Sequence, residues 1–262
     1  MASIVASDLK AFLSVNNPEN DASNSGGIIQ DELHANGSIR CEIVDLAAAD
    51  TVTAVSGVTG GADQRSLTIT GRNAGGTIVA QTLPLNGTTP VVFSGNTFER
   101  IMKVEAASKN ASNTVTVTRT TGGASICTLP PNCVAVRRMF YDAASSSSGA
   151  LDRYEGHYFK SINTTNSLNA AAVTLTVDAL NHLTMVLAAA TGDISSPGNR
   201  LLGPGLSGYV DNGAAQTVPG GTLAIGPSAS GSRIFVWLKQ SLAQSAAAFK
   251  DSFTTQIAGT TT

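Results

Sequence analysis

Hydrophobic and polar residues alternate with a period of two along much of this chain. Between residues 66 and 70, Leu67 and Ile69 alternate with serine and threonine, and the same alternation recurs at 113–119 and 172–178. Such alternation places one face of a β-strand against a core and the other toward solvent. These three segments are therefore predicted to be half-buried strands.

Further apolar runs are separated by clusters of Gly, Asn, Asp and Pro, at the spacing expected of antiparallel sandwiches. These strand candidates are 38–44, 77–83, 134–141, 157–162, 183–188 and 232–238. Strands and helices do not alternate along the chain, which argues against a parallel nucleotide-binding sheet. One helical turn is expected within 240–253, where Leu242, Ala246, Phe249 and Phe253 recur on one face.

The stretch LTITGRNAGGTIVAQTLPLNGTTP, residues 67–90, carries two reversal signals. GRNAGG supplies residues that tolerate positive φ where a hairpin reverses, and LNGTTP supplies a second reversal before Pro90. The segment is predicted to be a meander that builds one sheet. A phosphate-binding loop is disfavoured, because the Gly-x4-Gly-Lys-Ser/Thr pattern is missing and no helix follows.

A length of 262 residues favours two domains. The Gly and Pro pairs of RTTGGASICTLPPNC, residues 119–133, indicate the seam, giving domains 1–125 and 126–262. The chain is thus predicted to be all-β, with two antiparallel β-sandwich domains of immunoglobulin-like topology and long loops. The predicted core residues are Leu67, Ile69, Val115 and Val117 in the first domain, and Val173, Leu175, Val177, Phe235 and Trp237 in the second.

Three polar segments are expected to lie outside the cores. Four consecutive serines make residues 143–152 a surface loop, and residues 190–221 form a loop long enough to be functional or held by a neighbour. Residues 16–29 are polar with paired glycines and cannot bury enough apolar surface alone. We interpret them as an arm that orders only against a partner.

The chain is poor in charge. Charged residues make up 13%, about half the usual share of roughly 25%, which suggests that copies of the chain or a partner cover much of the surface. The net charge is −2 and the basic residues form no stripe, so no nucleic acid is expected as a partner. No uncharged run approaches the roughly 20 residues that span a bilayer, and Asp8 and Lys10 interrupt the N-terminal apolar run, so neither a membrane anchor nor a signal peptide is expected.

The chain contains three cysteines: Cys41, Cys127 and Cys133. An odd count spread over a large chain is not a disulfide framework, and free thiols are expected. Cys127 and Cys133 flank TLPPN and are also placed to meet across it, or to join a histidine in a metal site. Their spacing is not the Cys-x2-Cys knuckle of structural zinc, so no metal is expected.

The glycines Gly203, Gly205 and Gly208 match Gly-x-Gly-x-x-Gly literally, but YVDNG follows where a dinucleotide site needs a helix. Around Ser207 the same loop resembles a nucleophile elbow, except that Tyr209 replaces the required second glycine. The match is interpreted as chance.

The histidines His34, His157 and His182 lie in separate regions. Asp152 and Glu155 are near His157 in sequence, which allows a Ser, Asp and His grouping with the serine loop. The favoured interpretation is that LDRYEGHYF begins a strand with solvated charges and an exposed or hydrogen-bonded imidazole. Trp237 is interpreted as strand core in preference to a sugar-stacking residue. Neither an enzyme nor a cofactor is expected.

Five segments of the chain carry a resemblance to a known group of proteins: LSVNNPENDASNSGGII, LTITGRNAGGTIVAQTLPLNGTTPVVFSGNTFERIMKV, KNASNTVTVTRTTGG, YFKSINTTNSLNAAAVTLTV and SRIFVWLKQSLAQSAAAFKDSF. Together they resemble small virion structural proteins of tailed bacteriophages. The resemblance covers most of the chain through turn and strand patterns. It implies a pair of β-sandwich modules that assemble on the particle, most often as capsid decoration or cement proteins and sometimes as neck or tail components. It brings no catalytic residues.

The function expected from this resemblance is structural: decoration and stabilisation of a phage capsid by bridging major capsid protein subunits. The alternative is a neck or tail component, or a host-surface binding module. A dimer or trimer on the capsid surface of the virion is expected, after synthesis in the bacterial host cytoplasm. The predicted contact residues are Asn16, Asn17, Pro18, Glu19, Asn20, Gly26, Gly27, Arg200, Leu201 and Leu202.

Overall fold

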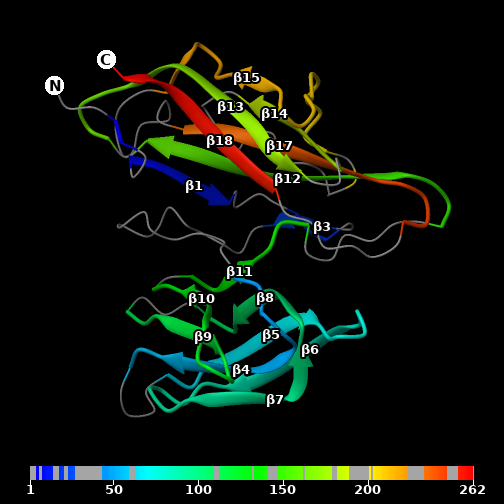
Figure 1. Cartoon of the computed structure of the whole chain (residues 1–262). Coiled ribbons are helices and arrows are strands. Elements are labelled where there is room, and N and C mark those ends of the chain that lie inside the picture. The colour runs from blue at the N-terminus through cyan, green and yellow to red at the C-terminus, as the bar shows by residue number, and fades with distance from the viewer. Residues whose placement is uncertain are drawn as a thin grey trace. The chain divides into compact units, whose positions relative to one another are not determined.

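The structure is a computed structural model, and its described part is built from β-strands without an α-helix (Figure 1), which confirms the predicted all-β class. The immunoglobulin-like topology stays a prediction. The described residues are 4–5, 8–13, 18–20, 23–26, 43–58, 63–108, 112–131, 133–140, 147–161, 163–178, 182–188, 201, 203–223, 233–246 and 253–261.

The chain divides into two compact units, and the first of them is discontinuous in sequence. The composite unit consists of Met1–Gly27 with Ala143–Thr262, and the inserted unit is Ile28–Asp142. The boundary therefore lies after Asp142 and not after residue 125, and the first 27 residues do not belong with the unit that follows them. The Gly and Pro pairs that suggested a seam are turns within the inserted unit.

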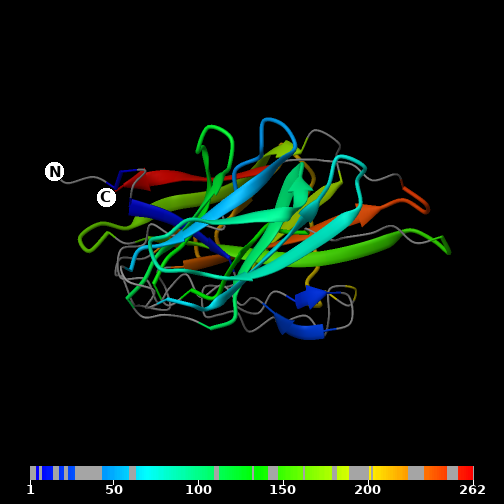
Figure 2. The ribbon, with the colours of Figure 1, turned by 90° about the horizontal axis from the view of Figure 1, so that it is seen from below.

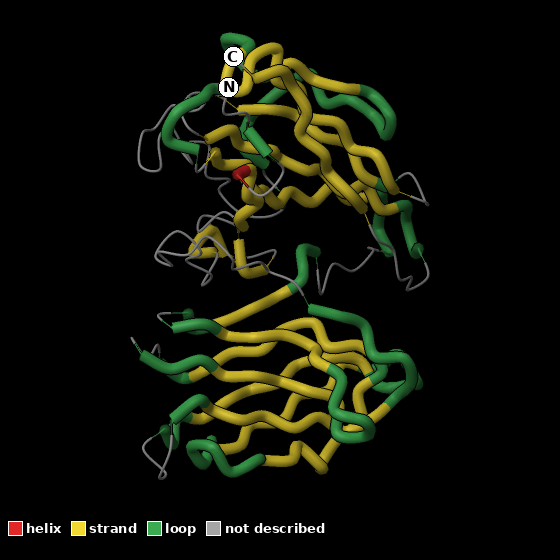
Figure 3. Tube along the Cα trace, turned by 60° about the vertical axis from the view of Figure 1, so that its left-hand side comes forward, coloured by secondary structure: helices red, strands yellow, loops and turns green. Residues whose placement is uncertain are grey.

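The inserted unit is formed by two four-stranded sheets in which every pairing is antiparallel (Figure 3). One sheet has the order β10-β9-β4-β7 and the other β11-β8-β5-β6. The strands are β4 (Asp50–Ser56), β5 (Ser66–Arg72), β6 (Ile78–Pro84), β7 (Val91–Phe98), β8 (Arg100–Ala106), β9 (Val115–Arg119), β10 (Ser125–Leu129) and β11 (Ala135–Arg137).

Alternation buries one face of the central strands β4, β5 and β9 in the core of the inserted unit. In β4, Val52 and Ala54 are fully buried, while Thr53 between them and Thr51 before them are half-buried. The four predicted core residues of this unit, Leu67, Ile69, Val115 and Val117, are at most 1% exposed and belong to one hydrophobic cluster. The core prediction is confirmed here.

The predicted hairpin of β5 and β6 forms, with a register from Ser66 opposite Pro84 to Arg72 opposite Ile78. Its turn is stabilised by Asn73 Oδ1, which accepts a hydrogen bond from the Thr77 amide at 3.0 Å. The second reversal, with Gly87 at φ +53°, does not continue a meander. It carries the chain from the edge of one sheet to β7 in the other, so that part of the prediction is wrong.

The composite unit contains one four-stranded sheet, β1-β12-β17-β14, and a second sheet in which β13 pairs with β18 along one edge and with β15 and β16 along the other. Its β2 and β3 form a separate two-stranded ladder, the blue arrows at the lower right of Figure 2. The strands are β1 (Leu9–Leu13), β2 (Pro18–Asn20), β3 (Ser23–Gly26), β12 (Leu151–Ser161), β13 (Leu168–Asp178), β14 (Leu183–Ala188), β15 (Ala215–Thr217), β16 (Thr222–Leu223), β17 (Arg233–Leu242) and β18 (Phe253–Thr261).

In the composite unit the core prediction is confirmed for the described side chains. Val173, Leu175, Phe235 and Trp237 are at most 1% exposed, while the side chain of Val177 lies outside the described set.

Two other predictions are covered only in part by the described residues. The helical turn is not seen in the described residues of 240–253, because β17 runs to Leu242, a non-helical turn follows at 243–246, and β18 begins at Phe253. Residues 247–252 are not described. The predicted strand at 38–44 is not seen in its described residues, 43 and 44.

Candidate functional site

The predicted contact residues are only partly covered by the structure. Pro18–Asn20 form β2, and Gly26 ends β3, so the proposed arm folds back on itself, with Pro18 opposite Gly26. Leu201 lies in a turn and is 38% exposed. Asn16, Asn17, Gly27, Arg200 and Leu202 lie outside the described residues. Contact of this set with a partner stays a prediction.

The catalytic grouping around His157 is not supported by the geometry of β12. Residues two apart along a strand share a face, so Asp152 and His157 point to opposite faces of the sheet. Asp152 accepts a hydrogen bond from Ser241 Oγ at 2.6 Å, and its side chain is 44% exposed. His157 is 6% exposed, and its Nε2 lies 2.9 Å from Thr255 Oγ1 of β18 in the other sheet. His34 lies outside the described residues.

A row of polar side chains lies buried on the face of β12 that carries His157. Arg153 is 2% exposed, and Glu155 and Ser161 are fully buried. The predicted strand at LDRYEGHYF is confirmed, and so is the hydrogen-bonded imidazole of His157. The prediction that the charged side chains of this strand are solvated is wrong for Arg153 and Glu155. Burial lowers the pKa of His157 to about 4, so the imidazole is neutral at neutral pH.

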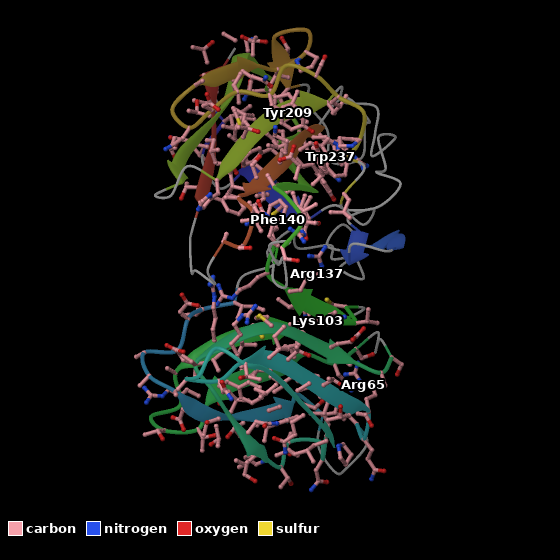
Figure 4. All side chains as sticks on the ribbon, turned by 90° about the vertical axis from the view of Figure 1, so that its right-hand side faces the viewer. Arg65, Lys103, Arg137, Phe140, Tyr209 and Trp237 are labelled. Carbon is pink, nitrogen blue, oxygen red and sulfur yellow. The ribbon has the colours of Figure 1, made fainter. Side chains whose placement is uncertain are left out.

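The opposite face of the same sheet carries an aromatic cluster (Figure 4). Trp237 is fully buried against Gly156, and this excludes it from sugar stacking on a free surface. The rings of Tyr154 and Tyr209 meet edge to face, with centroids 6.0 Å apart. Burial raises the pKa of both tyrosines, and Lys239 lies over the Tyr209 ring at 5.6 Å. The side chains of this cluster pack against one another.

The literal glycine motif serves the loop that covers this cluster. Gly203, Gly205 and Gly208 all have positive φ, and the Gly203 backbone passes so close to the Tyr154 ring that a Cβ would approach it to 2.9 Å. No helix follows the motif; instead Val210 exchanges two backbone hydrogen bonds with Met185. This supports the interpretation of the motif as chance.

Cys127 and Cys133 are buried free thiols in the core of the inserted unit. Burial, with Cys133 nearby, raises the pKa of Cys127 to about 12, and the Cys133 thiol donates to the Ala135 carbonyl at 3.0 Å. Within the described residues no three His, Cys, Asp or Glu side chains are grouped as a metal site would need. Cys41 lies outside the described residues.

An uncharged surface covers the outer side of the sheet β10-β9-β4-β7, and we call it the threonine face. Its side chains are half-buried or exposed, and paired strands place them next to one another. Thr53 and Thr120 hydroxyls lie 2.9 Å apart at one end of it. The threonine face consists of Thr51, Thr53, Val55, Val92, Thr116, Thr118 and Thr128.

Sequence reasoning did not single out the threonine face as a site. Its signal was present, because the threonines alternate with core residues in 113–119 and in β4, but the alternation was interpreted only as strand formation. The face became visible as a surface only when the register placed Thr53 beside Thr118, and Val55 beside Thr116.

Comparison of the chain with protein-family models, curated proteins and solved structures finds no match. In the part of the chain that the structure describes, no helix is long and apolar enough to cross a bilayer.

Proposed function

We propose that this chain is a structural virion protein that decorates and stabilises a bacteriophage capsid by bridging major capsid protein subunits. The observation that favours this function is the threonine face, a broad sheet surface without a charged side chain. Covering such a face desolvates no ion, and it immobilises β-branched side chains that have little rotamer freedom to lose. Hydroxyl groups on the same face supply hydrogen bonds that fix the orientation of a partner.

Decoration of a shell also suits a protein that acts without chemistry of its own. Each contact on a repeating shell is made many times, so a modest affinity per site gives a large combined effect on particle stability. On β12, the buried His157 and the solvent-facing Asp152 do not form the convergent acid and base pair that an enzyme site needs.

The proposal is tested by binding the purified protein to heads that lack it. Thr53→Lys combined with Thr118→Lys places two ammonium groups on the threonine face, and we expect occupancy on the head to fall strongly while the fold is kept. The control is Ala80→Lys with Thr82→Lys on β6, where both residues are exposed on the other sheet. Unchanged binding of the Thr53 and Thr118 variant would exclude the threonine face as the contact.

Particle stability provides the second test. Heads without the protein should break at lower temperature or under milder osmotic shock, and adding the protein back should restore them. Deleting residues 16–27 should also lower occupancy if the arm contributes to the contact. If heads without the protein are equally robust but fail to join tails or to attach to cells, the neck, tail or host-binding alternative replaces the capsid function.

A further inference from the structure

Strand β18 forms one edge of a sheet in the composite unit. It is nine residues long and pairs with β13 almost throughout, from Leu168 opposite Thr261 to Asp178 opposite Phe253. Within the described residues, β13 is the only strand that pairs with it. The residues from Ala258 to Thr261 are all exposed. An open edge offers unpaired amide and carbonyl groups to another strand.

Among the described strands, the other long edges carry local contacts. Met185 of β14 exchanges two backbone hydrogen bonds with Val210, and the Leu187 amide donates to Gln216 Oε1 at 2.7 Å. On β10, the Ile126 carbonyl accepts from the Val44 amide at 2.8 Å.

The edge strands β6 and β7 are each partly occupied by a side chain of the other strand. The Gly95 amide of β7 donates to Gln81 Oε1 of β6, and the Ala80 carbonyl of β6 accepts from Asn96 Nδ2 of β7. Strands β11, β15 and β16 are at most three residues long, and β1 carries a lysine.

The sequence of β18, FTTQIAGTT, contains none of the residue types by which proteins protect an edge. It has no lysine, no other charge and no proline. Gly259 is constrained to remain glycine by its approach to β13, because a Cβ there would lie 2.7 Å from the Asn169 carbonyl oxygen. The edge is thus long and neutral, and its pairing with β13 shifts register twice, between Asn169 and Ala172 and between Leu175 and Val177.

We propose that two copies of this chain pair through β18, edge to edge and antiparallel, across a twofold axis. In such a pair residue i of one strand faces residue j of the other and residue j faces residue i, so like charges placed on both sides of the axis would face one another. A register centred on Ile257 places Thr254 opposite Thr260. The same register places Gln256 opposite Ala258, and every cross-strand pair is neutral.

Pairing of this kind joins the two β13–β18 sheets into one continuous sheet. Its outer surface would carry Ala172 and Thr174 beside Ala258 and Gln256, and no charged side chain would lie beside the junction at these positions. The occupant is a second copy of the chain, because a twofold axis requires an edge that is complementary to itself, and this neutral edge brings no like charges together. The inference concerns the protein in solution and does not depend on the capsid function.

The test uses two charge variants of the full chain. The lysine variant carries Gln256→Lys with Ala258→Lys, and the glutamate variant carries Gln256→Glu with Ala258→Glu. Wild-type protein should sediment at twice the chain mass of 26.6 kDa. Each variant alone should associate about 100-fold more weakly, because like charges face one another across the axis. An equimolar mixture should restore the pair as a heterodimer.

The matched control is Ala80→Lys with Thr82→Lys, which adds the same charges at the same spacing to the exposed positions of β6 and should leave the pair intact. A wild-type chain that sediments as a monomer overturns the proposal. So does a lysine variant that stays paired, or a mixture that stays monomeric while both variants melt like the wild type.

A second measurement on unmodified protein covers the case in which the variants do not fold. Hydrogen exchange of the β18 amides should slow as protein concentration rises, while exchange in β14 should not change. Exchange in β18 that is independent of concentration overturns the self-pairing. If it then slows only when empty heads are added, a capsid strand occupies the edge instead of a second copy.

Discussion

The buried imidazole of His157 makes the stability of the composite unit depend on pH. The ring lies between two sheets, contacts Thr255 at 2.9 Å, and packs edge to face on Phe159 with centroids 5.3 Å apart. The charged groups on the same strand face are Arg153 and Glu155, both buried. Protonation of His157 in the folded state therefore requires a cation in a site closed to water.

The size of the effect follows from the two pKa values. Burial lowers the pKa of His157 from 6.5 to about 4 in the folded protein. The unfolded chain binds the proton more tightly, so stability from this group is full above pH 6.5 and is lost as the pH falls from 6.5 toward 4. At about 1.4 kcal/mol per pKa unit the complete loss is about 3 kcal/mol, of which about 2 kcal/mol has gone by pH 5.

The measurement is urea unfolding at several pH values, followed by tryptophan fluorescence. Trp237 is the single tryptophan and is buried in the composite unit, so the signal reports the unit that contains His157. The His157→Gln variant keeps a polar side chain near Thr255 but cannot titrate, and its stability should fall by about 2 kcal/mol less than that of the wild type between pH 8 and pH 5. Equal losses in the two proteins, or a His157 resonance that titrates near 6.5, would refute the reasoning.

Three other substitutions or reagents test the cores. Leu175→Asp places a charge at a fully buried position and should unfold the composite unit, at a cost of several kcal/mol; an unchanged Trp237 melting temperature would show that Leu175 is not core. Asp63→Asn should destabilise the inserted unit by about 2 to 3 kcal/mol, measured by urea unfolding followed by circular dichroism. The reason is that the Asp63 carboxylate, whose pKa is held at about 2 by Arg65, also accepts a hydrogen bond from Ser56. A loss of stability no larger than that caused by Asp152→Asn, at a half-exposed carboxylate, would contradict this role. Cys127, with its pKa raised to about 12, should react with a thiol reagent only in denaturant, and rapid labelling of the native protein would show that the thiol is accessible.

Strands whose two faces differ were predictable from the sequence. The prediction at 183–188 coincides with β14, and those at 66–70 and 113–119 lie within or over β5 and β9. Strand β8 is buried on both faces, so its residues show no alternation to detect. Strand β18 does alternate, but Leu242, Ala246 and Phe253 also fit a helical spacing, and the pairing with β13 that decides between them is a long-range contact.

The domain boundary failed for a related reason. Gly122 and Gly123, with φ of +81° and +65°, form the turn between β9 and β10, and the turn composition does not distinguish a hairpin from a linker. The pairing of β1 with β12 leaves no local trace in the sequence, because its partner lies beyond the whole inserted unit. The threonine face could not be predicted from the sequence either, because it depends on the register between strands. The burial of the charged residues of β12 could not be predicted because it depends on which sheet covers the strand.

The discontinuity of the composite unit has a consequence for the order of events during synthesis. The ribosome releases β1 first, but β12, against which β1 must pair, emerges only after all the strands of the inserted unit. The inserted unit, whose strands are contiguous in sequence, can therefore complete its folding while β1 remains without its partner. No described strand of residues 28–142 pairs with a described strand of the composite unit, so a chain spliced from Gly27 to Ala143 would still contain both partners of every described strand pair of that unit.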